Sequence, residues 1–272
     1  MGEARSILFF DVDGTIIWHK PGGDVAETVA NARPSEAVTQ AFHELRKRGH
    51  LAFICTGRPL ALIAESLLAL EPAGIISSAG ACVSLGDEML VDEAVEPAHT
   101  VRVLECAESC GIPVLLEATA GDVAYAVNGA TYGEGAAELV VHSVDELRAH
   151  TDMRFTKFVT YTSDLEALKS VDPAFFDANF DFFDLGLGIC EFTAKGVDKG
   201  YGVRRALESL GCGIEGTFAF GDSENDLPMA DAVETFVAMG NALPAVKARA
   251  AYVTSSVQDD GVVSALEHFG LL

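Results

Sequence analysis

Basic residues, long apolar runs and closely spaced cysteine pairs are all scarce in this chain of 272 residues. Its 18 Lys and Arg residues stand against 41 Asp and Glu residues, which gives a formal net charge of −23. A surface this acidic repels nucleic acids and anionic membranes, so we expect neither as a partner. An anionic substrate would need a cation or local hydrogen-bond donors to hold it. The charge favours solubility and indicates no particular protein partner.

Two further absences bear on where the protein works. No apolar run approaches the roughly 20 residues that cross a bilayer, and Ile7–Phe10 is too short for the apolar part of a signal peptide. The six cysteines include no C-x-x-C pair, which is typical of reduced thiols and not of a disulfide framework or a zinc site. We therefore expect a cytoplasmic protein.

The first third of the chain alternates between short apolar runs and amphipathic stretches. The apolar runs predict buried strands, and apolar residues at helical spacing predict helices between them. This β-α-β-α-β order indicates a parallel sheet with right-handed crossovers. In chain order we predict a strand at 7–10, a loop at 12–33 that contains Gly22 and Gly23, a helix from Pro34–Glu36 toward Gly49, a strand at 51–55, a helix at 59–70 and a strand at 75–77.

The same rhythm returns near the C-terminus, whereas the residues between have a different pattern. In the middle, alternating runs accompanied by two or three helices predict a mostly antiparallel α+β region. We therefore predict the α/β class, with a core domain of residues 1–84 and 194–272 and an inserted α+β domain of residues 85–193. The predicted elements are strands at 89–91, 123–127, 155–161 and 182–192 with helices at 99–109 and 165–171, then a helix at 199–210, strands at 217–220, 234–238 and 252–254, and helices at 226–232 and 262–269.

Two carboxylates follow the first predicted strand, in Asp11-Val12-Asp13-Gly14-Thr15. An extended strand points Asp11 and Asp13 to the same side, and open α/β sheets bind their ligands at the carboxyl ends of strands. A functionless Asp-Gly turn explains the segment equally well when it is taken alone.

A second acidic cluster, Gly221-Asp222-Ser223-Glu224-Asn225-Asp226, also follows an apolar strand. The two strand ends could present carboxylates to one point, and hard oxygen ligands suit Mg²⁺. Asp and Asn residues also favour the start of a helix, where they cap free N–H groups. Both interpretations can hold at once.

Two weaker signals lie at neighbouring positions. Thr56-Gly57-Arg58 ends the second strand and is a plausible phosphate contact or a generic turn, whereas Lys199 at a helix start could supply one positive charge. The segment 211–216 matches G-x-G-x-x-G, but it follows a helix and precedes a strand, the reverse of a dinucleotide site. We interpret it as a helix-to-strand connection.

In order and spacing, these four segments resemble the motifs of the haloacid dehalogenase (HAD) superfamily. Asp11–Thr15 resembles the first motif, Thr56–Arg58 the second, Lys199-Gly200 the third and Gly221–Asp226 the fourth. The long insertion resembles the type IIB cap of the Cof-type phosphatase branch. The resemblance implies a Rossmannoid parallel sheet with a cap that sets substrate specificity. One departure is Ala79-Gly80-Ala81, where that branch usually has Asn-Gly-Ala.

The resemblance also implies roles. Asp11 would be the nucleophile, and Asp13 the general acid and base. Mg²⁺ would be held by Asp11, the Asp13 backbone carbonyl and Asp222, and would offset the repulsion between Asp11 and an anionic substrate. Phosphate would be bound by Thr56 with the Gly57 N–H, by Lys199 and by Asn225. Asp226 would orient Lys199 or a metal-bound water.

Within the superfamily, Asp13 favours phosphate-ester hydrolysis, because a halide leaving group needs no acid. We expect a phosphoric monoester hydrolase that acts on a small phosphorylated metabolite, such as a sugar phosphate. A phosphotransferase acting on a small acceptor would use the same core, and a catalytically silent metabolite-binding protein would keep only the fold. The second alternative is disfavoured, since a binder needs no nucleophile and acid together.

Overall fold

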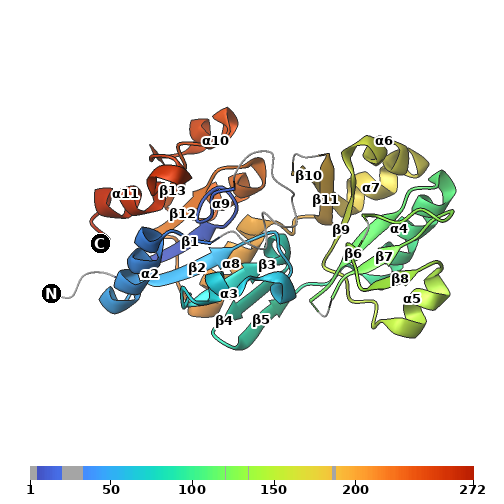
Figure 1. The fold of residues 1–272 in the computed structure, drawn as a ribbon, viewed down its shortest axis with the longest axis horizontal. Coiled ribbons are helices and arrows are strands. Elements are labelled where there is room, and N and C mark those ends of the chain that lie inside the picture. The colour runs from blue at the N-terminus through green and yellow to red at the C-terminus, as the bar shows by residue number, and fades with distance from the viewer. Residues whose placement is uncertain (1–4, 20–32, 120, 134, 186–187) are drawn as a thin grey trace. The chain divides into compact units, whose positions relative to one another are not determined.

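The computed structural model describes residues 5–19, 33–119, 121–133, 135–185 and 188–272. The chain divides into two compact units, which Figure 1 shows in blue to cyan with orange to red, and in green to yellow. The first unit comprises Met1–Arg58, Leu62–Val91 and Asp198–Leu272, and the second comprises Pro59–Ala61 and Asp92–Val197. We call them the core and the insertion.

The core contains an eight-stranded sheet with β1 near its centre. The strand order is β14-β13-β12-β1-β2-β3-β4-β5, and every pair from β14 to β3 is parallel, whereas β4 is antiparallel to β3. The strands are β1 (Ile7–Asp11), β2 (Leu51–Cys55), β3 (Gly74–Ser77), β4 (Cys82–Leu85), β5 (Glu88–Asp92), β12 (Thr217–Gly221), β13 (Thr235–Ala238) and β14 (Tyr252–Val253).

Strand β1 is buried along its whole length, as a continuous apolar run in a parallel sheet should be. The ring of Phe10 packs against Phe220 of β12 and against Phe42, with centroids 4.6 and 4.9 Å apart. The register pairs Phe10 with Phe220 across β1 and β12. This packing therefore brings the carboxyl ends of β1 and β12 together at one edge of the sheet.

The core helices begin and end at residues suited to those positions. In α8 (Lys199–Leu210), the side chain of Asp198 accepts a hydrogen bond from the Tyr201 N–H, and Gly211 ends the helix in the left-handed conformation. Residues 211–216 then lead to β12, which confirms the helix-to-strand connection. The other core α-helices are α2 (Glu36–Arg48), α3 (Glu65–Leu68), α9 (Leu227–Ala230), α10 (Pro244–Arg249) and α11 (Gly261–His268).

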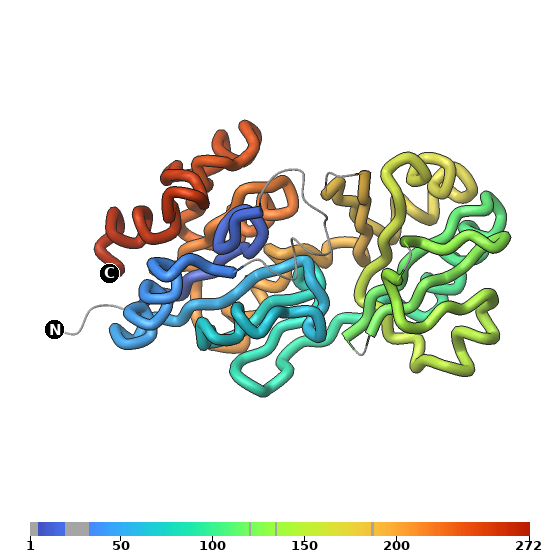
Figure 2. Tube along the Cα trace, in the orientation of Figure 1, coloured from blue at the N-terminus to red at the C-terminus, as the bar shows by residue number. Residues whose placement is uncertain are grey.

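The insertion contains a six-stranded mixed sheet in the order β10-β11-β9-β6-β7-β8. Leu116, Phe158 and Phe192 point to one side of this sheet and join its apolar cluster with residues of the helices. Their alternation places Glu117 and Lys157, paired across β6 and β9, on the opposite side. The elements are α4 (Pro97–Cys110), β6 (Val114–Glu117), β7 (Val123–Tyr125), β8 (Leu139–Val141), α5 (Val144–His150), β9 (Lys157–Tyr161), α6 (Thr162–Val171), α7 (Pro173–Asn179), β10 (Phe180–Asp184) and β11 (Ile189–Ala194). Figure 2 follows the chain through both units.

The predicted class, a parallel α/β core with a separate α+β insertion, is confirmed. Three local predictions were wrong. The strand expected at 182–192 is instead two strands, β10 and β11, which pair antiparallel to each other. The run 89–91, expected in the insertion's sheet, forms β5 of the core sheet. The helix expected at 59–70 is replaced by a 3-10 turn at Leu60–Leu62 and by α3, because Ala64 is extended and interrupts it. Most of the predicted loop at 12–33, with Gly22 and Gly23, lies outside the described residues.

Among the described residues, no helix is both long and apolar enough to cross a membrane.

Candidate active site

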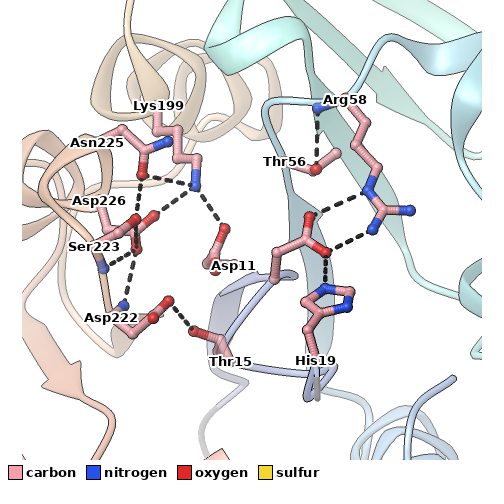
Figure 3. A network of polar contacts seen from close by, with 11 residues as sticks. Asp11, Thr15, His19, Thr56, Arg58, Lys199, Asp222, Ser223, Asn225 and Asp226 are labelled. Carbon is pink, nitrogen blue, oxygen red and sulfur yellow. Dashed lines mark hydrogen bonds and ion pairs between the residues drawn. The ribbon is translucent and has the colours of Figure 1, made fainter. Parts of the chain in front are cut away.

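Three neighbouring strand ends deliver the site to the carboxyl edge of the core sheet (Figure 3). Strand β1 ends at Asp11, β12 is followed by Asp222, and β2 is followed by Thr56. Helix α8 adds Lys199 from its first position. Asp11 and Lys199, 188 positions apart in the sequence, therefore meet. This agrees with the expectation that the carboxyl ends of parallel strands form the ligand site.

Gly14 allows the first loop to approach Asp222 closely. Its φ is +94°, a conformation that side chains rarely adopt, and a Cβ atom there would lie 2.3 Å from Asp222 Oδ2. On the same carboxylate, Thr15 Oγ1 donates a hydrogen bond to Oδ1 over 3.5 Å. The glycine that follows the two aspartates is thus required by both backbone conformation and space.

Lys199 is the cation at the centre of the site. Its Nζ lies 2.6 Å from Asp11 Oδ1, 2.6 Å from Asp226 Oδ1 and 3.4 Å from Asn225 Oδ1, and the side chain is 2% exposed. The two buried carboxylates raise the pKa of Lys199 well above its ordinary value, although burial alone would lower it. Lys199 is therefore charged and ties β1 to the loop after β12.

Both carboxylate oxygens of Asp226 accept hydrogen bonds from the protein. Its Oδ1 accepts from Lys199, and its Oδ2 accepts from the backbone N–H groups of Asp222 and Ser223 at 2.9 and 3.0 Å. The residue is completely buried. These contacts hold Lys199 and the loop that contains Asp222 against Asp226.

The donor set fits a hard divalent cation. Carboxylate oxygens of Asp11, Asp222 and Asp226 lie within 4.8 Å of one another, and the buried Asp11 Oδ2 has no hydrogen-bond partner in the part of the chain that the structure describes. Burial and the Asp226 charge raise the pKa of Asp11 well above its ordinary value and raise the pKa of Asp222 to about 7. The raised pKa values mean that the cluster has too little positive charge nearby to keep its carboxylates ionised. A bound cation would supply that charge, and oxygen ligands of this kind suit Mg²⁺.

Asp13 has different partners from Asp11. Arg58 donates to it twice, from Nε to Oδ2 at 3.1 Å and from Nη2 to Oδ1 at 2.6 Å, and His19 Nε2 lies 2.5 Å from Oδ1. The hydrogen bonds from His19 and Arg58 outweigh burial and lower the pKa of Asp13 to about 2. Asp13 is therefore held in its ionised form, the form that a general base requires.

The second motif is built around its own turn. Thr56 Oγ1 accepts a hydrogen bond from the Arg58 N–H at 3.1 Å, and the side chain is buried. Gly57 lies in the turn between them, at the edge where β2 ends. The structure thus links Asp11, Lys199, Asn225 and Asp226 directly, whereas Thr56 is linked to Asp13 through Arg58.

Sequence reasoning missed His19 and Asn241 and gave Arg58 no role. Asn241 Nδ2 donates to the Gly14 carbonyl at 2.8 Å and to Asp222 Oδ2 at 3.4 Å, and its Oδ1 accepts from the Val257 N–H. Asn241 follows β13 at the same carboxyl edge, so the strand-end rule that found Asp11 could have found it.

In the insertion, two polar or aromatic side chains, Tyr125 and Glu117, have structural partners. Tyr125 is fully buried and donates to Glu108. Glu117 lies 3.1 Å from Lys157 Nζ, which is 2.5 Å from Glu191 and 3% exposed. This group, which we call the Lys157 triad, holds two carboxylates and one ammonium, and burial raises the pKa of Glu117 to about 7.

Comparison with known proteins identifies the family. Residues 8–266 match the model of the haloacid dehalogenase-like hydrolases, and the chain belongs to this family. It is 30% identical over 260 residues to a phosphoglycolate phosphatase of Methanothermobacter thermautotrophicus, a match that covers 95% of this chain and 96% of that one. The resemblance inferred from the four motifs is confirmed, and the protein is an enzyme of this hydrolase family.

Solved structures confirm the fold. The subclass IIB sugar phosphatase BT4131 superposes with a TM-score of 0.78 at 24% identity, covering 98% of this chain and 100% of that one. BT1666 from Bacteroides thetaiotaomicron, a phosphatase of the same superfamily, gives a TM-score of 0.81 at 22% identity, covering 98% and 96%. These likenesses extend over both units and show the HAD IIB architecture.

Proposed function

We propose that the protein is a Mg²⁺-dependent phosphatase that hydrolyses a small phosphorylated metabolite through an aspartyl-phosphate intermediate. The observation that carries the proposal is Asp11 at the end of β1, with one oxygen 2.6 Å from the charged Lys199 and the other buried with no hydrogen-bond partner among the described residues. Family membership supports the same reaction class.

Asp11, the backbone carbonyl of Asp13 and Asp222 would hold the metal. When bound, Mg²⁺ supplies positive charge that offsets the repulsion between Asp11 and the phosphate dianion. Asp226 contributes indirectly, because both of its oxygens already accept hydrogen bonds from the protein. In a chain with a net charge of −23, this local positive charge is needed for an anionic substrate to enter.

Different side chains of this protein carry out the separate steps of the reaction. An oxygen of Asp11 forms a bond to phosphorus as the bond to the leaving oxygen breaks. Asp13, which is ionised in the free site, takes up a proton from solvent when the substrate binds and passes it to that oxygen. Water next attacks the phosphorus of the aspartyl-phosphate, Asp13 takes its proton, and the Asp11 carboxylate leaves. Lys199, Thr56 and the Gly57 N–H stabilise charge on the phosphoryl oxygens, and Asn225 orients them.

The insertion is our candidate for the specificity domain, with bounds near the expected 85–193. Two similar proteins act on small phosphorylated compounds, since one is a phosphoglycolate phosphatase and another a sugar phosphatase. Both likenesses span the whole chain, insertion included. They support a small phosphorylated acid or sugar as the substrate and disfavour a phosphoprotein.

Phosphate release from a panel of sugar phosphates, phosphoglycolate and 4-nitrophenyl phosphate tests the proposal. We expect turnover with Mg²⁺, none with EDTA, and none with Asp11→Asn in a folded protein. Asp145→Asn makes the same chemical change at an exposed side chain of α5 and serves as the matched surface control. A phosphorylated acceptor in place of free phosphate would identify a phosphotransferase, and metabolite binding without turnover would identify a binding protein.

A further inference from the structure

His19 lies beside the proposed acid and base because the first loop turns back on itself. The Gly14 N–H donates to the Ile17 carbonyl at 2.8 Å, and the Ile17 N–H donates to the Val12 carbonyl at 2.9 Å. A β-bridge joins Asp13 to Ile17. This turn places His19, six positions after Asp13, next to the Asp13 carboxylate.

The contact itself is short and directional. His19 Nε2 lies 2.5 Å from Asp13 Oδ1, and Nδ1 is buried and has no hydrogen-bond partner among the described residues. Arg58 donates to both oxygens of the same carboxylate, so Asp13 acts as the acceptor in this cluster and we assign the hydrogen to His19 Nε2. Asp13 is therefore the group that orients the imidazole, and the imidazole in turn restrains Asp13.

Arg58 holds the same carboxylate from a different strand end. Its Nη2 and His19 Nε2 share Asp13 Oδ1, and its Nε donates to Oδ2. Three donors from two segments fix the plane of the carboxylate. The Asp13 side chain is 41% exposed, whereas Arg58 is 12% and His19 25% exposed, so the two donors are better shielded from water than the carboxylate they hold. The contacts therefore restrain the position of Asp13 and add little to stability.

We propose that His19 is a positioning residue that holds Asp13 as the base for the second half of the reaction, in which water attacks the aspartyl-phosphate. The inference rests on the proposed phosphatase function. In many enzymes a neighbouring side chain orients the general base. Here the imidazole of His19 would orient the carboxylate of Asp13. His19 acts through Asp13, the carboxylate that its Nε2 contacts.

The test separates the two half-reactions with 4-nitrophenyl phosphate, whose leaving group needs no acid. In His19→Ala we expect kcat to fall about tenfold, a fraction of the roughly 100-fold or more that a general base contributes. We expect KM to fall by the same factor, so kcat/KM stays constant, because kcat/KM reports only formation of the aspartyl-phosphate. Stopped-flow traces should show a burst of nitrophenol that approaches one equivalent per enzyme.

Two variants complete the design. His19→Gln keeps an N–H donor at similar reach and should recover most of kcat, whereas His43→Ala, on the exposed surface of α2, should leave all parameters unchanged. Unchanged kcat in His19→Ala, or a loss of kcat/KM without a burst, would overturn the role of His19. Absence of Mg²⁺-dependent phosphate release by the wild-type enzyme would instead overturn the phosphatase function on which the proposal rests.

Discussion

Replacing Lys199 with Met removes the buried cation on which three carboxylates depend. Oxygens of Asp11, Asp222 and Asp226 would remain within 4.8 Å of one another with no positive side chain bonded to them. Breaking a buried ion pair by removing one partner costs about 3–5 kcal/mol. We therefore expect Lys199→Met to lose about 3–5 kcal/mol of unfolding free energy at pH 8 in EDTA.

Two conditions should reduce this loss. Lys199 lowers the pKa of Asp11, so its removal raises that pKa further, and the penalty should grow as the pH rises and shrink toward pH 5, where the carboxylates take up protons. Added Mg²⁺ should also restore stability, because a ligand that binds only the folded state stabilises it.

Urea unfolding followed by far-UV circular dichroism measures both effects. Lys47→Met makes the same chemical change on the exposed face of α2 and should alter stability by less than about 0.5 kcal/mol. If Lys199→Met were as stable as this control at pH 8 in EDTA, the claim that the carboxylate cluster depends on the positive charge of Lys199 would be refuted.

Three further predictions concern the metal site and the Lys157 triad. Gly14→Ala should abolish Mg²⁺ binding by calorimetry, because its Cβ would lie 2.3 Å from Asp222 Oδ2; normal binding would contradict the steric argument. Since the pKa of Asp222 is about 7, Mg²⁺ affinity should fall roughly tenfold per pH unit below 7, and a flat calorimetric profile from pH 5.5 to 7 would contradict this. The pKa of Glu117 is raised from 4.5 to about 7, so its contribution to stability is full below about 4.5 and is lost as the pH rises through about 7. Urea unfolding of the wild type should therefore lose up to about 3 kcal/mol over that range relative to Glu117→Gln, which leaves Lys157 with one carboxylate; parallel pH profiles would contradict this.

The sequence predicted the parts of the fold in which local signals agree. Helix α8 was predicted at its observed bounds, since Asp198 and Gly211 cap it and its apolar residues follow the helical period. Strands β1 and β12 were found as apolar runs that end in acidic segments. In contrast, β6 and β8 were missed, because short apolar runs do not by themselves distinguish a strand from a buried helix segment.

Within the site, the sequence located the residues at strand ends but not the contacts made by the turns. The pairing of His19 with Asp13 depends on how residues 13–17 return along the strand, which no residue pattern specifies. The departure at Ala79 acquires a physical meaning only in three dimensions. Its φ is +55°, a left-handed conformation in which Asn is favoured over Ala, so the substitution removes a residue suited to that backbone.

Covalent trapping of the intermediate tests the central claim most directly. Asp13→Asn should form the aspartyl-phosphate from 4-nitrophenyl phosphate and Mg²⁺ but hydrolyse it slowly, because the base is missing. After acid quenching, peptide mass spectrometry should place one phosphate on Asp11, and Asp11→Asn should carry none. Wild-type turnover of the same ester with no phosphate on Asp11 in the trapped variant, or with phosphate on another residue, would contradict the account.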